Sequence, residues 1–201
     1  MMKTSTNYFL ILTLFVFVCG SAFSQKDDDK GPDLITITAG WSAADLVIDG
    51  EEVTDVRHGF FGGVRKDFKL APIFSLNTGI LYVQKGATFK FGDAESEWEL
   101  DYLELPVGLK AKLGPVFATA GLSANIRINS QIDGEKTSDI EDFDVNAFAL
   151  SSSLGLGVKI LMFSVDARWQ YGFTDIISDN DGDAVNNNYF LIGLGFGIGG
   201  R

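Results

Sequence analysis

One group of side chains in this sequence has the residue types that a hydrolase needs. Asp55 and His58 lie three residues apart, and Ser42 lies upstream of them. A serine activated by a histidine, which a carboxylate orients, is an arrangement of nucleophilic catalysis. The sequence has no nucleophile elbow and no second histidine to support this interpretation. We therefore favour a lone histidine at the rim of the fold and predict no catalytic residues.

A second group of side chains resembles part of a calcium-binding loop. Asp179, Asp181 and Asp183 alternate with Asn180 and Gly182. An EF-hand loop that began at Asp179 would need glutamate at its twelfth position, where this chain has Phe190. Asp, Asn and Gly are also ordinary turn formers. We expect a turn here and no cofactor, with calcium at the three aspartates as the alternative.

The composition excludes several functional classes. The chain has 201 residues, with 16 Lys and Arg against 27 Asp and Glu, and its net charge is −11. Nucleic-acid binding needs a basic surface, so we expect no nucleic-acid partner. One Cys and one His cannot build a zinc site of several Cys and His ligands. No Walker or Rossmann glycine motif is present.

The N-terminus has the features of an export signal. Lys3 precedes an apolar run from Tyr8 to Val18, and Ala22-Phe23-Ser24 places small residues before Gln25. Such a segment is a cleavable secretory signal and is too short to cross a bilayer as a helix. We predict a signal peptide over residues 1–24, cleavage near Ser24/Gln25, and one β-barrel domain over residues 25–201.

Period-two alternation dominates the rest of the chain and predicts eight β-strands. It is clearest from Leu100 to Leu113 and, after the turn Gly114-Pro115, from Val116 to Ile128. In the first segment one face is Leu, Val and Ala, and the other face includes Glu104, Pro106 and Lys110. Proline cannot donate to a strand ladder, so we expect a local bulge at Pro106.

The lengths of the connections alternate along the chain. Residues 69–71, 114–115 and 160–162 are predicted turns, whereas residues 45–56, 85–97, 129–142 and 174–188 are predicted polar, acidic loops. Short turns at one end and long loops at the other are typical of an outer-membrane barrel. We therefore predict an all-β fold, an eight-stranded antiparallel up-and-down transmembrane β-barrel with its apolar face outward and a polar lumen.

A soluble barrel would have the opposite polarity, with apolar residues inside. Two features favour the membrane form. The polar face is crowded with Gly and Ser, which suits a narrow lumen, and aromatic residues mostly lie near strand ends, as interfacial girdles do. The predicted interfacial aromatics are Trp41, Tyr82, Trp98, Trp169, Tyr171 and Tyr189.

The enclosed charges of both signs should neutralise one another inside the lumen. We predict a lumenal polar network of Glu104, Lys110, Asn125, Arg127, Asp166 and Arg168. If Leu113 pairs with Val116 across the turn, Glu104 lies opposite Asn125, and we then expect a contact between Glu104 and Arg127. Eight strands leave an interior that side chains fill, so this network is predicted to be a plug and not a channel.

Three segments resemble the PorT-like outer-membrane β-barrels of Bacteroidota. They are Leu103-Glu104-Leu105-Pro106-Val107-Gly108-Leu109-Lys110, Leu81-Tyr82-Val83-Gln84-Lys85-Gly86-Ala87 and Tyr171-Gly172-Phe173-Thr174-Asp175-Ile176. The resemblance extends from Gln25 to Arg201. It implies a barrel in the bacterial outer membrane, surrounded by its lipid and inserted by the barrel-assembly machinery. The chain departs from the usual aromatic ending of such barrels, because it ends Gly199-Gly200-Arg201.

Taken together, these features predict a non-enzymatic, porin-like envelope protein with a structural or protein-interaction role. The resemblance adds secretion-accessory work as one form of that role. An envelope partner is expected to bind through loops 129–142 and 174–188. The alternatives are a barrel that binds a small apolar molecule and a hydrolase at the rim.

Overall fold

The computed structural model describes residues 34–48, 51–52, 55–91, 94–132, 135–136, 146–174 and 185–198. The predicted signal peptide, residues 1–24, lies outside these residues. The strands are β1 (Leu34–Ile48), β2 (Glu51–Glu52), β3 (Asp55–Lys69), β4 (Phe74–Phe91), β5 (Ala94–Leu113), β6 (Val116–Ile132), β7 (Glu135–Lys136), β8 (Phe148–Ile160), β9 (Phe163–Gly172) and β10 (Val185–Ile198). No helix in the described part of the chain is long and apolar enough to cross a membrane.

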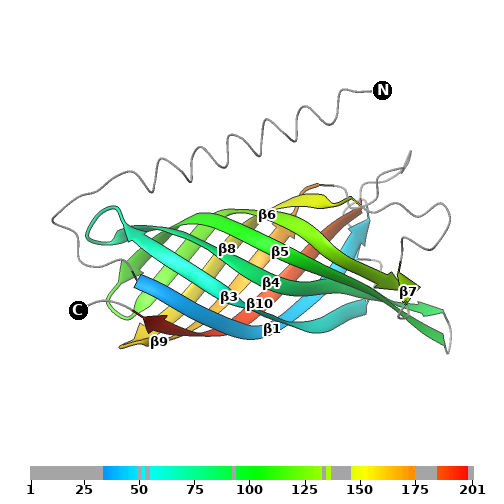
Figure 1. Ribbon diagram of the computed structural model, residues 1–201, viewed down its shortest axis with the longest axis horizontal. Helices are drawn as coiled ribbons and strands as arrows, with labels where there is room; N and C mark the ends of the chain where they lie inside the picture. Colours follow the sequence, from blue (N-terminus) through cyan, green and yellow to red (C-terminus); the bar gives the residue numbers. More distant parts are fainter. Residues whose placement is uncertain are drawn as a thin grey trace, which may run out of the picture. The chain divides into compact units, whose positions relative to one another are not determined.

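Eight of these strands form one closed antiparallel barrel (Figure 1). Each long strand pairs with the next along the chain, and β10 pairs with β1 from Ile35–Ile198 to Ile48–Val185, which closes the sheet. The two-residue strands β2 and β7 pair antiparallel with the ends of β1 and β6. The predicted fold of eight up-and-down strands is therefore confirmed.

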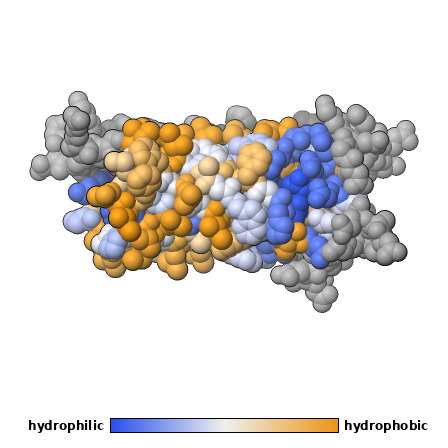
Figure 2. Space-filling model, turned by 90° about the horizontal axis from the view of Figure 1, so that it is seen from below, coloured by the Kyte–Doolittle hydropathy of each residue, from blue (hydrophilic) through white to orange (hydrophobic). Residues whose placement is uncertain are grey.

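The period-two pattern determines which side chains face the lumen. In β9 the exposed residues Val165 and Trp169 alternate with the buried residues Asp166, Arg168 and Gln170. Because successive side chains of a strand point to opposite faces, the alternation leaves the outer wall apolar. Figure 2 shows this apolar belt, with hydrophilic residues gathered toward the end that carries β7 in Figure 1. The predicted polarity, apolar outside, is confirmed.

The short turns lie together at one end of the barrel. Leu113 pairs with Val116 as predicted, and Gly114 between them has φ +59°, a conformation that glycine adopts without strain. We call this end the turn end and the opposite end the loop end.

The strands run further toward the loop end than the alternation predicted. β4 and β5 stay paired as far as Phe91 and Ala94, so most of the predicted loop 85–97 is a β-hairpin. Likewise β1 reaches Ile48 and β3 begins at Asp55, inside the predicted loop 45–56. The backbone ladder does not need an apolar face, so it continues beyond the apolar belt where the sequence pattern fades.

The predicted bulge at Pro106 is wrong. Pro106 pairs with Ser123 on β6, and the pairing of β4 with β5 keeps one register on both sides of it, from Thr78–Val107 to Leu81–Glu104. Register shifts occur instead between Val56 and Phe61 in β3 and between Asp101 and Tyr102 in β5. The missing amide hydrogen interrupts pairing with one neighbour without adding a residue to the strand.

A closed barrel has no free edge for detergent or another chain to open. We therefore expect the refolded protein to keep its fold in cold dodecyl sulfate and to change its mobility on a denaturing gel only after boiling. Identical mobility with and without heating would contradict a closed barrel of this stability.

Candidate functional site

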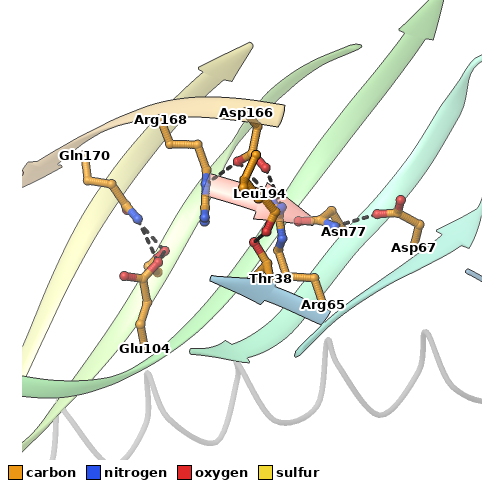
Figure 3. Close-up of polar contacts among 10 residues, drawn as sticks. Thr38, Arg65, Asp67, Asn77, Glu104, Asp166, Arg168, Gln170 and Leu194 are labelled. Atoms are coloured by element: carbon orange, nitrogen blue, oxygen red, sulfur yellow. Dashed lines mark hydrogen bonds and ion pairs between the residues drawn. The ribbon is translucent and has the colours of Figure 1, made fainter. Parts of the chain in front are cut away.

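The middle of the lumen holds an ion triad of Asp166, Arg65 and Arg168 (Figure 3). Arg65 Nη2 donates to Asp166 Oδ1 at 2.6 Å, and Arg168 Nε donates to Asp166 Oδ2 at 2.9 Å. All three side chains are buried, and Asp166 is only 2% exposed. Arg65 comes from β3 and the other two residues from β9, so the triad joins parts of the wall that are not neighbours in the sheet.

A second cluster surrounds Glu104, which is fully buried on β5. Its Oε1 accepts from Gln170 Nε2 at 2.7 Å and from Ser123 Oγ at 3.1 Å, and its Oε2 accepts from Tyr189 Oη at 3.0 Å. Three donors on three other strands satisfy a carboxylate that would otherwise be very costly to bury.

Lys85 lies beside this cluster and brings the compensating charge. Its Nζ donates to Asn125 Oδ1 at 2.8 Å and lies 3.6 Å from the ring centre of Tyr189. Tyr189 therefore contacts Glu104 through its hydroxyl and Lys85 through its ring. One aromatic side chain connects the two opposite charges.

The third cluster lies nearer the turn end. Lys110 Nζ forms an ion pair with Asp67 Oδ2 at 2.7 Å, and Asn77 Nδ2 donates to Asp67 Oδ1. Lys110 Nζ also lies 4.3 Å from the ring centre of Phe117. Both charged side chains remain partly accessible, in contrast to the triad.

Apolar side chains also enter the lumen. Phe61, Leu81, Val83, Tyr189 and Leu191 form a buried cluster with Ala44. The guanidinium of Arg168 lies 5.2 Å from the ring centre of Phe61, which joins this cluster to the triad. The prediction of a polar lumen is therefore incomplete, because the interior is both polar and apolar. An eight-stranded barrel is just wide enough for side chains to fill it.

The structure brings most of the predicted network inside. Glu104, Asn125, Asp166 and Arg168 are buried, and Glu104 pairs with Asn125 in the predicted register. The partners that hold Glu104 are, however, Ser123, Gln170 and Tyr189, and the predicted contact with Arg127 stays a prediction. Arg127 is half-buried opposite Tyr102.

Sequence reasoning missed Arg65, Lys85, Gln170 and Tyr189. Arg65 lies in the segment whose alternation Phe60-Phe61 blurs, because the apolar ring of Phe61 faces the lumen as Arg65 does. Lys85 lies in a predicted loop that is part of β4. The alternation of β9 already placed Gln170 on the polar face, so a signal for this residue was present.

Two of the predicted interfacial aromatics are wrong. Tyr189 is 2% exposed and Trp98 is 3% exposed, so neither contacts lipid. Tyr189 points inward to Glu104, and Trp98 Nε1 donates to Ser130 Oγ. The hydrogen-bonding capacity of the two rings is used inside the protein instead of at an interface. Trp41, Trp169 and Tyr171 are exposed and Tyr82 is half-buried, and their place at a membrane interface stays a prediction.

The hydrolase arrangement does not form. His58 is exposed and stacks on Trp41, with ring centroids 5.1 Å apart, whereas Ser42 is buried and its Oγ donates to the carbonyl of Gln84. The imidazole and the hydroxyl thus lie on opposite sides of the wall. The calcium candidates Asp179, Asp181 and Asp183 lie outside the described residues, within which no group of three or more possible metal ligands occurs.

Comparisons with solved structures identify similar barrels. Neisserial surface protein A is 13% identical with a TM-score of 0.53, over 83% of this chain and 99% of that chain. Ail, the attachment invasion locus protein of Yersinia pestis, is 15% identical with a TM-score of 0.47, over 83% and 99%. OprG of Pseudomonas aeruginosa is 14% identical with a TM-score of 0.45, over 85% and 97%.

A search of curated protein sequences found no match. The family model described as outer membrane protein beta-barrel domain matches residues 23–178, which is well over half of the chain. With the closed eight-stranded barrel, this match identifies the chain as a bacterial outer-membrane protein that belongs to the outer membrane protein beta-barrel domain family.

Proposed function

We propose that this protein is a non-conducting outer-membrane barrel that works as an interaction protein of the envelope, through the surface at its loop end. The observation that carries the proposal is the filled lumen. The triad around Asp166, the cluster around Glu104 and the apolar cluster with Phe61 occupy successive parts of the interior. If nothing passes through the lumen, we infer that the protein acts through the surfaces exposed at the ends of the barrel.

The loop end supplies the surface that such a role needs. Strands β4 and β5, of 18 and 20 residues, are longer than the roughly 9–11 residues that cross a bilayer at a tilt. The four loop segments predicted from the sequence hold 17 Asp and Glu against three Lys and no Arg. A strongly acidic surface attracts and orients a basic partner. We infer that the partner presents a basic surface.

The filled lumen predicts that the protein conducts no ions. Reconstituted into a planar bilayer, the protein is expected to give no stable conductance steps, because interior ion pairs and packed rings leave no continuous water path. A sixteen-stranded porin in the same membrane is the positive control. Stable unitary steps from the purified, heat-modifiable protein would overturn the proposal of a plugged barrel.

The interaction role is tested by shortening loops 129–142 and 174–188. Residues 137–145 and 175–184 can each be replaced by a short Gly-Ser linker without removing a described strand residue. We expect each variant to fold, as its gel shift will report, and to lose proteins that cross-link to the wild type in the native envelope. Replacement of the turn residues 70–73 by a Gly-Ser linker of the same length is the control, because it changes the opposite end of the barrel. An unchanged set of cross-linked proteins would contradict the proposal.

The resemblance to the PorT-like barrels of Bacteroidota rests on the three strand motifs. It supports secretion-accessory work as one form of the proposed envelope-interaction role. A deletion strain provides the test, because secretion-accessory work predicts that exported proteins accumulate inside the cell. Normal export in that strain would leave the envelope-interaction role and remove the secretion link.

A second candidate function is the binding of a small apolar molecule. The outer wall carries a hollow of about 500 Å³ lined by Leu109, Leu154, Trp169 and Phe190 with several alanines. The internal cavity beside Lys85 and Tyr189, at about 20 Å³, has room for only about one water molecule. Mass spectrometry of compounds that co-purify in nanodiscs tests this candidate, which is rejected if only the supplied lipids are found.

A further inference from the structure

We propose that the turn end of the barrel is a second interaction surface, which binds a carboxylate-rich segment of a periplasmic protein. In outer-membrane barrels the short turns face the periplasm and the long loops face outward. The proposed surface therefore lies opposite the loop surface and does not depend on its role.

Four lysines lie on the inner face of the wall near the turn end. Lys110 and Lys112 belong to β5, Lys159 to β8 and Lys69 to β3. Alternation places Lys69 on the same face as Asp67, two residues before it, and the same rule relates Lys112 to Lys110. Lys69 and Lys112 are exposed, and Lys159 is half-buried. These four residues are named the basic mouth.

The basic mouth has too little negative charge nearby. Asp67 is the one carboxylate of the described residues that pairs with it, through Lys110 at 2.7 Å. Within the described residues, no hydrogen bond or ion pair holds the ammonium groups of Lys69, Lys112 and Lys159. Three ammonium groups at one opening produce a positive potential that attracts an anion.

The position of these lysines favours a protein carboxylate over a lipid headgroup as the anion. They line the inside of the barrel wall, whereas lipid headgroups surround the outside. Lys66, on the outer face of β3, is the residue that headgroups can reach, because it pairs with the exposed Ile35 and its ammonium lies over the ring of Phe68.

The lysines of the basic mouth are attached to separate parts of the wall. Its lysines come from β3, β5 and β8, which are separated along the wall by β4 and β6. Neighbouring strands lie about 4.8 Å apart, so the outermost lysines are attached on the order of 19 Å apart along the wall. A peptide with several carboxylates can reach all of them at once, and each exposed pair adds a small gain.

The test uses the full-length protein in nanodiscs of uncharged lipid and a fluorescent hexaglutamate peptide. Fluorescence anisotropy should report binding that weakens as salt is raised, with no binding of a matched hexaglutamine peptide. A variant with Lys69→Gln, Lys112→Gln and Lys159→Gln is expected to weaken binding about tenfold, the sum of three modest charge pairs. Lys66→Gln is the matched control and should leave binding unchanged. The gel shift shows whether each variant is folded.

The outcomes separate the sources of the anion. Loss of hexaglutamate binding in the folded triple variant, with Lys66→Gln unaffected, supports the proposal. Equal loss in Lys66→Gln would indicate general attraction to the surface and overturn it. Displacement of the peptide by submillimolar inorganic phosphate would indicate a small-anion site and also overturn it. No binding to the folded wild type rejects it outright. None of these results bears on the loop-end surface.

Discussion

Replacement of Asp166 by alanine is expected to destabilise the barrel by about 3–5 kcal/mol, because it leaves two buried guanidinium groups without their carboxylate. Arg65 and Arg168 both donate to Asp166, and the exposed fractions of the three side chains are 6%, 6% and 1%. One Arg168 nitrogen, Nη2, has no hydrogen-bond partner among the described residues. Urea unfolding of the refolded protein, followed by tryptophan fluorescence, measures the effect.

Two variants separate this explanation from simple loss of packing. Adding Arg65→Met to Asp166→Ala should recover part of the lost stability, because one of the two uncompensated charges is then absent. Asp67→Ala is the matched control, since Asp67 also pairs with a cation but is 15% exposed against 1% for Asp166, and its effect should be smaller than that of Asp166→Ala. If Asp166→Ala costs no more than Asp67→Ala, the triad does not stabilise the barrel as argued.

Gly40→Val is expected to prevent closure of the barrel. Gly40 pairs with Gly193 across the contact between β1 and β10, the two ends of the sheet. A Cβ at Gly40 would lie 2.0 Å from the carbonyl oxygen of Ile192 and 2.8 Å from the ring of Phe61. Overpacking usually costs about 1–3 kcal/mol, and here the backbone of the partner strand must also move. The heat-modifiable band should be lost.

Gly62→Val provides the comparison for the closure argument. A Cβ at Gly62 meets nothing nearer than 3.7 Å, and the residue lies on β3, which pairs with β1 along the edge opposite to the contact with β10. The same side chain should therefore be tolerated there, with the gel shift retained. A normal gel shift for Gly40→Val would mean that β1 and β10 can separate locally without loss of the barrel.

Asp166→Ala and Gly40→Val test different features of the same fold. Asp166→Ala changes the charge balance of the plug, and Gly40→Val changes the backbone contact that closes the wall. A plug that stabilises the barrel agrees with the proposed non-conducting role. The loop end and the basic mouth are the two surfaces that we propose for interaction with partners.

The number of strands, the polarity of the wall and one hairpin register could be predicted from the sequence. Each depends on a short-range rule. Side chains alternate with period two, and a two-residue turn determines which residues face each other beyond it. The pairing of Leu113 with Val116 and of Glu104 with Asn125 followed from that rule alone. The buried positions of Asp166 and Arg168 followed from the alternation of β9.

The contacts across the lumen could not be predicted in this way. Arg65 and Asp166 are 101 residues apart and lie on strands that do not pair, so no local pattern relates them. Tyr189 lies near a strand end, where the composition indicates a membrane interface, and yet its hydroxyl reaches Glu104. Which interior side chains meet depends on the stagger with which eight strands close. Alternation determines the face of each residue locally, whereas closure determines its neighbours and is a property of the whole chain.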